Sequence, residues 1–261
     1  MHFRKSLHLS ATLIVVMLLI TACGSSGNSS PTEPTAPPTA SADELSVGDV
    51  IALADTTWPT VTSMRVTTKS SSASTEIDDA AFTGTVEDWT SNGNRHIIEF
   101  ENGIATNEQI YADGVIYVRG VFVSAAIAPG LDVNTWVNVE EGAYDADSSV
   151  GVQLQYLIRP QNNAYGEISQ DLLSRPVQDG GETVVGDRTC HLYTFGDEEG
   201  TGDEIRYEIS VDSDGLPCQV VQSAGDYQVI TTYLFDLDVN IAAPLEGTPA
   251  AATPEGATPE G

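Results

Sequence analysis

The sequence has few basic residues. Ten Lys and Arg stand against 38 Asp and Glu, which gives a formal net charge of −28 at pH 7. A chain with this charge repels nucleic acid and anionic lipid headgroups, so we expect neither as a partner. The acidic residues are spread along the chain, which is typical of a solvated surface. The charge therefore excludes some partners and identifies none.

Catalytic motifs are absent. The sequence contains no G-x-S-x-G, H-E-x-x-H, C-x-x-C, G-x-G-x-x-G or G-x-x-x-x-G-K. His191 follows Cys190, but adjacent residues of a strand point to opposite faces, so this pair does not predict a nucleophile and its base. We therefore expect no enzyme and no cofactor.

Metal-binding patterns are weak. The acidic segment 197–204 could collect a hard cation such as calcium, although charged hairpin tips are usually just solvated. Asp212, Asp214 and Gly215 match part of a calcium loop, yet Ser210 stands where the first acid belongs and Leu216 begins a break in the pattern. A turn is the favoured interpretation, and we expect no metal.

No apolar run reaches the roughly 20 residues that cross a bilayer. The longest, residues 11–20, follows Arg4 and Lys5 and precedes small residues that end at Cys23, as in an export signal. The run Leu-Ile-Thr-Ala-Cys that ends at Cys23 resembles a bacterial lipobox. This resemblance implies cleavage before Cys23, its acylation by palmitate-type chains, and a lipid anchor on the extracytoplasmic side of a cell membrane. The alternative is an ordinary signal peptide with an incidental cysteine.

Composition divides the rest of the chain. Residues 1–22 are the expected lipoprotein signal peptide, and residues 23–43 are rich in Ser, Pro and Thr, which predicts a disordered tether. Residues 245–261 contain the repeat ATPEG twice and predict a second disordered segment. Residues 44–244 are then long enough for one domain with a substantial core.

Only two cysteines remain after Cys23. Cys190 and Cys218 form an even pair in a chain that is expected to be exported, which favours a disulfide. Two free buried thiols are the alternative.

The hydrophobic pattern predicts the fold class. Most of the domain alternates apolar and polar residues, and the Asp113-Gly114 pair between two apolar runs indicates a hairpin. Residues 46–55 and 149–175 follow helical spacing instead and predict three short helices. The last strand is expected over residues 227–239. We therefore predict an α+β fold, a strongly curved antiparallel β half-barrel of about 10–11 strands covered by short helices, because so large an open sheet must curl or be covered.

Several segments resemble a known family. These are the lipobox with its tether, the hairpin 111–118, the strand and turn 209–217, and the closing segment 235–244. Together they resemble the LolA-like carriers and, more closely, the LppX/LprG-type lipid-carrying lipoproteins. The resemblance implies a half-barrel closed by helices over an apolar cavity, with lipids or acyl chains as cargo. The cysteine pair is not part of the family pattern.

The resemblance also implies a binding site. A lipid or other hydrophobic ligand would lie between sheet and helices. Arg119 or Arg159 could meet an anionic headgroup, although a solvated surface arginine is the favoured interpretation of both. The alternative is a non-transporting envelope binding or sensory module with a filled core. In either case we expect a monomer that is attached to the membrane through its anchor. The residues expected to form the cavity wall and lid are apolar: Val50, Ile51, Phe82, Ile98, Phe100, Leu154, Leu157, Leu172, Tyr193, Phe195, Tyr207, Ile209, Tyr233 and Phe235.

Overall fold

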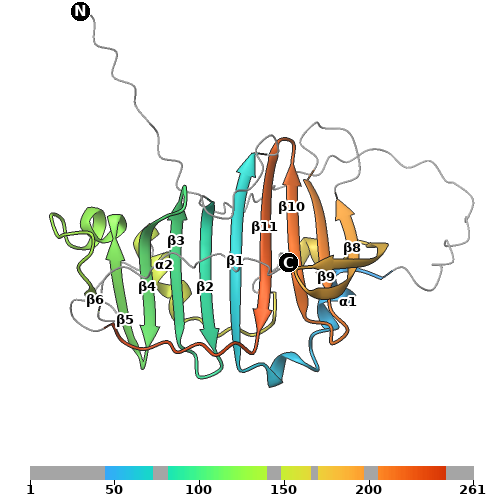
Figure 1. Ribbon diagram of the computed structural model, residues 1–261, viewed down its shortest axis with the longest axis horizontal. Helices are drawn as coiled ribbons and strands as arrows, with labels where there is room; N and C mark the ends of the chain where they lie inside the picture. Colours follow the sequence, from blue (N-terminus) through green and yellow to red (C-terminus); the bar gives the residue numbers. More distant parts are fainter. Residues whose placement is uncertain (1–44, 73–81, 140–147, 166–169, 197–204, 245–261) are drawn as a thin grey trace, which may run out of the picture. The chain divides into compact units, whose positions relative to one another are not determined.

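The computed structural model describes residues 45–72, 82–139, 148–165, 170–196 and 205–244. These segments form one antiparallel sheet of eleven strands with short helices against it (Figure 1). The expected signal peptide, the tether, the acidic segment 197–204 and the C-terminal tail lie outside the described residues. The strands are β1 (Ser63–Ser72), β2 (Thr83–Thr90), β3 (Arg95–Glu101), β4 (Ile104–Ala112), β5 (Val115–Gly120), β6 (Val137–Val139), β7 (Gln178–Val185), β8 (Arg188–Gly196), β9 (Ile205–Val211), β10 (Pro217–Ala224) and β11 (Tyr227–Phe235).

Two meanders build the sheet. Strands β1 to β6 follow one another in space, and so do β7 to β11, in the order β6-β5-β4-β3-β2-β1-β11-β10-β9-β8-β7. The meanders join where β1 pairs with β11, with Met64 opposite Phe235. Since β6 and β7 are the two edges and do not pair, the sheet stays open. Asp113 and Gly114 adopt φ angles of 54° and 83° in the predicted hairpin turn between β4 and β5.

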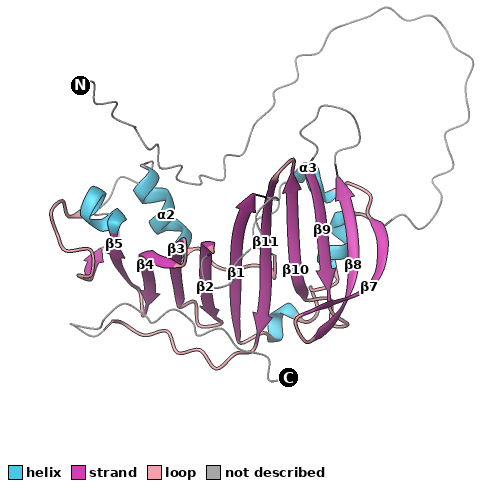
Figure 2. Cartoon of the chain, turned by 45° about the horizontal axis from the view of Figure 1, so that its top comes forward, coloured by secondary structure: helices cyan, strands magenta, loops and turns pink. Residues whose placement is uncertain are grey.

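The helices lie against one face of the sheet (Figure 2). Helix α1 (Val47–Ala52) and η1 (Trp58–Thr60) precede β1, η2 (Val123–Ile127) follows β5, and α2 (Ser149–Ile158) and α3 (Gln170–Leu173) connect β6 to β7. Ser46 starts α1 because its hydroxyl accepts a hydrogen bond from the Asp49 amide while the Asp49 carboxylate accepts one from the Ser46 amide. The predicted helices are confirmed, and η2 is a π-helix that the sequence pattern did not indicate.

Register assigns every strand residue to a face, since directly paired residues share a face and neighbours along a strand alternate. Met64, Trp89 and Ile209 contact the helices and define what we call the helical face. Residues of the other parity, such as Arg65 and Ile98, project from what we call the outer face. The predicted fold class, an α+β antiparallel half-barrel of 10–11 strands with short helices on it, is confirmed.

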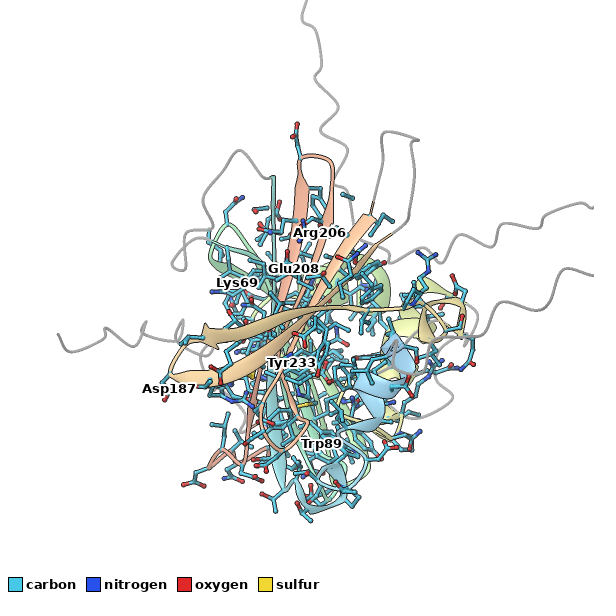
Figure 3. The ribbon with its side chains drawn as sticks, turned by 90° about the vertical axis from the view of Figure 1, so that its right-hand side faces the viewer. Lys69, Trp89, Asp187, Arg206, Glu208 and Tyr233 are labelled. Carbon is cyan, nitrogen blue, oxygen red and sulfur yellow. A yellow bond between two sulfur atoms is a disulfide. The ribbon has the colours of Figure 1, made fainter. Side chains whose placement is uncertain are left out.

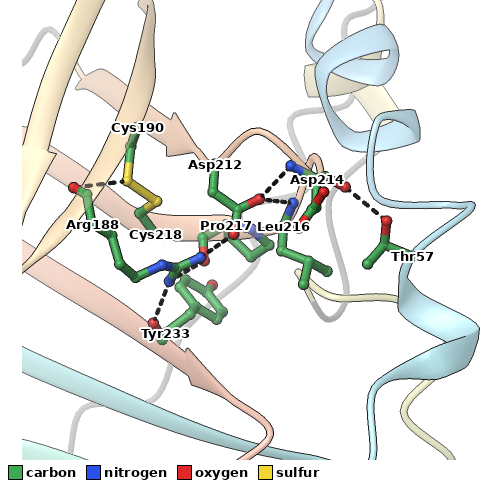
Figure 4. A network of polar contacts seen from close by, with 9 residues as sticks. All are labelled: Thr57, Arg188, Cys190, Asp212, Asp214, Leu216, Pro217, Cys218 and Tyr233. Atoms are coloured by element: carbon green, nitrogen blue, oxygen red, sulfur yellow. Dashed lines mark hydrogen bonds and ion pairs between the residues drawn. A yellow bond between two sulfur atoms is a disulfide. The ribbon is translucent and has the colours of Figure 1, made fainter.

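The sheet bends strongly at its β7 edge. Figure 3 shows the β7–β8 hairpin, with Asp187 at its tip, crossing the strands behind it on the side away from α1. This bend lets Arg188 donate hydrogen bonds to the carbonyl oxygens of Pro217 and Tyr233, at 3.4 and 3.0 Å, and form an ion pair with Asp212 (Figure 4). Strands that are not neighbours in the sheet are therefore connected at this end.

Cys190 and Cys218 are joined by a disulfide at the same end of the sheet (Figure 4). Cys190 lies on β8 and Cys218 on β10, so the bond passes over the intervening strand β9. Both cysteines are buried. The structure thus contains the pairing that the sequence favoured.

The last strand is shorter than predicted. It ends at Phe235 instead of residue 239, because Asp236 adopts a positive φ of 53° and turns the chain away from the sheet. The Asp236 carboxylate accepts hydrogen bonds from the Thr62 amide and hydroxyl, both at 2.9 Å. The chain then returns along the outer face, where Ile241 packs against Ile110 and Ala112.

Candidate ligand-binding face

Three apolar clusters occupy the helical face. The first lies at the β5 side, where Leu154 and Leu157 of α2 pack on Ile97, Ile116 and Val118. Leu154 and Leu157 have exposed fractions of 0% and 1%, so α2 is fixed to this part of the sheet. Each such side chain contributes roughly 1.5 to 3 kcal/mol by its burial.

The second cluster lies at the β8 side. Val47 and Val50 of α1 pack against Phe195, Ile209 and Val211, and Leu172 of α3 joins them. The rings of Phe195 and Tyr207 stack with their centroids 4.7 Å apart. Helices α1 and α3 therefore cover the side of the sheet that α2 leaves uncovered.

The third cluster lies between the other two and is rich in aromatic rings. Trp58 of η1 stacks on Trp89 of β2, with centroids 5.2 Å apart, and Tyr165 contacts Tyr233 of β11 at 6.5 Å. Burial raises the pKa of the Tyr165 and Tyr233 hydroxyls far above the ordinary value, so both stay protonated at physiological pH. Tyr165 belongs to this cluster and also contacts the second one.

The helices do not cover the helical face of the sheet completely. Several apolar residues of the helical face are only partly buried although they lie on central strands or near them: Val66, Tyr193, Tyr207, Val220 and Phe235. On α2, Tyr156 is 45% exposed and Val152 54% exposed, so this helix also presents apolar surface to solvent. Partly exposed apolar side chains on both layers are suited to contact with a hydrophobic ligand.

A polar group lies beneath α2 on the same face. Glu87 of β2 and Arg95 of β3 form an ion pair in which the Glu87 Oε1 and Arg95 Nε atoms are 3.1 Å apart. Arg95 also donates hydrogen bonds to the carbonyl oxygens of Tyr156 and Arg159 and to the side chain of Gln161. Its exposed fraction is 1%, which means that the guanidinium is enclosed by α2 and the segment that follows it.

Glu87 remains slightly accessible, with a side-chain exposure of 11%. The Tyr156 hydroxyl donates a hydrogen bond to Glu87 Oε2 at 3.1 Å, while its ring lies 4.8 Å from the Arg95 guanidinium. Burial raises the pKa of Glu87, against the attraction of Arg95 and the hydrogen bond from Tyr156. The centre of the helical face therefore contains an acidic side chain among apolar residues.

Eleven of the fourteen residues predicted as wall and lid lie in the three clusters of the helical face. Val50, Ile51, Leu172, Tyr193, Phe195, Tyr207 and Ile209 are in the second cluster, Tyr233 and Phe235 in the third, and Leu154 and Leu157 in the first.

The other three predicted residues do not join these clusters. Ile98 and Phe100 point to the outer face, since their neighbours Ile97 and Arg95 have the opposite parity. Phe82 contacts Phe100, with ring centroids 5.0 Å apart. These three side chains cannot line a space between sheet and helices, because period-2 alternation alone does not say which face of a strand meets the helices.

Neither basic residue suggested for a headgroup projects from a strand of the helical face. Arg119 is buried on the outer face, where its Nε donates a hydrogen bond to Glu108 Oε2 at 2.6 Å and its guanidinium lies over the Trp136 ring. Arg159 follows α2, and its carbonyl oxygen accepts a hydrogen bond from Arg95. Glu87 and Arg95 are not among the predicted site residues, although Glu87 has the same strand parity as Trp89 and so places a charged residue type on an apolar face.

The weaker chemical candidates have structural explanations. The Asp212 carboxylate accepts hydrogen bonds from the amides of Asp214 and Leu216, at 3.0 and 2.9 Å, as expected for a turn (Figure 4). Gly215 adopts a φ of 79° in that turn, and a Cβ there would lie 2.2 Å from the carbonyl oxygen of Leu53. Within the described segments no group of three or more His, Cys, Asp or Glu is placed to hold a metal ion. The Cys190 sulfur is in the disulfide, and His191 pairs with Asp179 at 2.7 Å.

Within the same segments, no helix combines the length and the apolar character that crossing a membrane requires.

Comparison with known proteins gives structural matches only. No family model matches the chain, and no curated protein matches its sequence. The lipoprotein LppX of Mycobacterium tuberculosis is 14% identical and matches with a TM-score of 0.45, over 75% of this chain and 98% of LppX. LprF of Mycobacterium bovis is 11% identical, with a TM-score of 0.41, over 76% of this chain and 96% of LprF.

A LolA superfamily protein of Nitrosomonas europaea is 8% identical and matches with a TM-score of 0.26, over 73% of this chain and 92% of that protein.

Proposed function

We propose that the helical face binds the hydrocarbon part of a lipid, so that the protein carries a hydrophobic ligand outside the cytoplasm. The observation that carries this proposal is the set of partly exposed apolar side chains on the central strands, Val66, Val220 and Phe235, between α2 on one side and α1 with α3 on the other. A face that only formed a core would bury these residues.

Energetics support an acyl chain as the ligand. Each methylene that leaves water for this face contributes about 0.8 kcal/mol. A chain taken from a bilayer exchanges one apolar environment for another, so uptake costs little and release to a second membrane is also possible. The aromatic rings of Tyr193 and Tyr207 offer broad apolar contacts at the β8 side.

Binding of a fluorescent fatty alcohol tests this proposal. The delipidated protein should bind the probe with saturation, and Val220→Asp on the helical face should weaken binding at least about tenfold, because the ligand would then lie against a charge. Fluorescence titration measures both affinities. The matched control is Leu234→Asp, which places the same charge on the outer face of β11 and should leave the affinity unchanged. Absence of saturable binding would reject the carrier function and favour an envelope module with a filled core.

We also propose that the protein is held at the membrane through acylated Cys23. The sequence around Cys23 supports this anchor, since it combines a basic start, a short apolar run and a lipobox. One acyl chain gives marginal membrane binding, whereas two or more give a stable anchor.

Cys23→Ser should therefore move the protein from the membrane fraction to the soluble fraction in a bacterial host and abolish incorporation of a labelled palmitate analogue. Immunoblotting of fractions and in-gel detection of the label measure these effects. Cys190→Ala/Cys218→Ala is the control that keeps Cys23. Continued labelling of Cys23→Ser would rule out this site of attachment.

A further inference from the structure

Basic side chains are unequally distributed between the two faces of the sheet. Apart from Arg4 and Lys5, all Lys and Arg of the chain lie in the described segments. The strand register places most of them on the outer face, as Figure 3 shows for Lys69: Arg65, Lys69, Arg119, Arg188 and Arg206. Arg159 and Arg175 lie in the loops that follow α2 and α3.

Arg95 is thus the single Lys or Arg on the helical face of the described strands. His191 of β8 lies on the same face and pairs with Asp179. Arg95 is 1% exposed, forms an ion pair with Glu87, and donates hydrogen bonds to Gln161 and to backbone carbonyls. Its charge is therefore already compensated inside the protein. The described strands of this face therefore offer an anionic headgroup no exposed Lys or Arg.

Acidic groups are available there instead. Glu87 lies at the middle of the face and retains 11% side-chain exposure, next to the half-exposed ring of Tyr156. A carboxylate can accept about four hydrogen bonds, and Glu87 has one from Tyr156 in addition to its ion pair with Arg95. Glu99 of β3 adds a second carboxylate on the same face, where it accepts a hydrogen bond from Asn107 at 2.7 Å. Thr68 and Thr231 contribute hydroxyls 3.3 Å apart on the adjoining strands.

We propose that Glu87, held between Arg95 and Tyr156, is a polar subsite that accepts a hydrogen bond from the hydroxyl or ammonium head of an amphiphile, and that the helical face rejects anionic heads. This inference rests on the proposed function, since the same face would hold the hydrocarbon chain. It specifies the class of ligand: neutral or cationic amphiphiles with a hydrogen-bond donor at the head, and not fatty acids or anionic phospholipids. Like charges brought together at a desolvated site disfavour the wrong ligand strongly.

A head-group series tests the inference on the unchanged protein. Dodecanol, dodecylamine and dodecanoate have the same chain length and are respectively neutral, cationic and anionic at pH 7.5. Each is used to displace the bound fluorescent fatty alcohol, and the concentration for half-displacement is measured below the critical micelle concentration. We expect dodecanol and dodecylamine to displace the probe at concentrations at least about tenfold lower than dodecanoate. Equal or better displacement by dodecanoate overturns the proposal.

Two matched variants separate Glu87 from the net negative charge of the protein. Glu87→Gln removes one negative charge from the helical face, and Asp88→Asn removes one from the outer face at the next residue. The difference between dodecylamine and dodecanoate should shrink severalfold in Glu87→Gln and persist in Asp88→Asn. If it shrinks equally in both variants, the selectivity comes from net charge and Glu87 is not the subsite.

Failure of the two proposals can be distinguished. If the protein binds no fatty alcohol at all, the proposed function is rejected, and the Glu87 subsite is rejected with it. A protein that binds the alcohol and prefers dodecanoate keeps the function and loses the subsite. Glu87→Gln leaves Arg95 without its counter-ion, so the folding of this variant is checked by circular dichroism. If the variant does not fold, the head-group series on the unchanged protein decides the proposal.

Discussion

Replacing Cys190 and Cys218 together by alanine is expected to lower the free energy of unfolding by about 3 to 4 kcal/mol. The disulfide joins residues separated by 28 positions, so it restricts the unfolded chain over a loop that includes β9 and the segment before it. In the folded protein both cysteines are at most 2% exposed. The native bond is therefore protected from reductant until the region around it opens.

Urea unfolding with and without a thiol reductant measures this effect. The wild type should lose stability when it is unfolded and refolded in reductant, whereas the double-alanine variant should be insensitive to it. The two proteins should then have similar midpoints under reducing conditions. A wild-type midpoint that reductant does not change, after the bond has been shown to be reduced, would contradict the prediction.

Arg119→Met is expected to destabilise the protein by about 3 to 5 kcal/mol at neutral pH. Arg119 is 4% exposed and Glu108 6% exposed, and the substitution leaves the Glu108 carboxylate buried with only His96 Nε2, 2.8 Å away, as a side-chain partner among those described. Urea unfolding at pH 7 measures the loss. The control Arg206→Met breaks an exposed ion pair with Glu208 on the same face and should cost less than about 1 kcal/mol.

The pH dependence of this variant has a defined direction. Burial raises the pKa of Glu108, but hydrogen bonds from His96 and Arg119 outweigh it and hold the pKa below the ordinary value of 4.5. Because the pKa of Glu108 is lowered in the folded wild type, the stabilisation from the ionised carboxylate is lost only as the pH falls below about 4.5. In Arg119→Met the pKa of Glu108 rises, so the carboxyl takes up a proton at higher pH. Protonation removes the cost of burying an unpaired charge. The stability difference between the two proteins should therefore narrow from pH 7 to pH 4, and a constant difference would rule out this explanation.

Local patterns predicted the strands and turns well, because each depends on residues close together in sequence. The alternation in β1 to β5 and the Asp113-Gly114 turn are examples. The end of β11 could not be predicted this way, since the alternation continues through Ile241 while Asp236 turns the chain by its positive φ. There the bond to Thr62, 174 residues away in sequence, determines the outcome.

The candidate site was predictable in part. Residues such as Phe195 and Ile209 were found because they belong to long aromatic and β-branched strands. The face of Ile98 and Phe100 depends on how β3 is registered against β2 and on where α2 lies, which no single segment reveals. Glu87 and Arg95 were missed for the same reason, since a buried ion pair becomes visible only when two strands and a helix are brought together.

The segment after β11 determines where the protein can be shortened. Ile241 is 9% exposed and packs against Ile110 and Ala112, and its carbonyl oxygen accepts a hydrogen bond from the Asn94 side chain at 3.1 Å. A recombinant fragment that ended with β11 would expose Ile110, Ala112 and the Asn94 side chain on the outer face. This exposed apolar surface would bind hydrophobic molecules non-specifically. Lipid-binding measurements on such a fragment would register that surface, so the smallest fragment fit for them must keep residues up to 244.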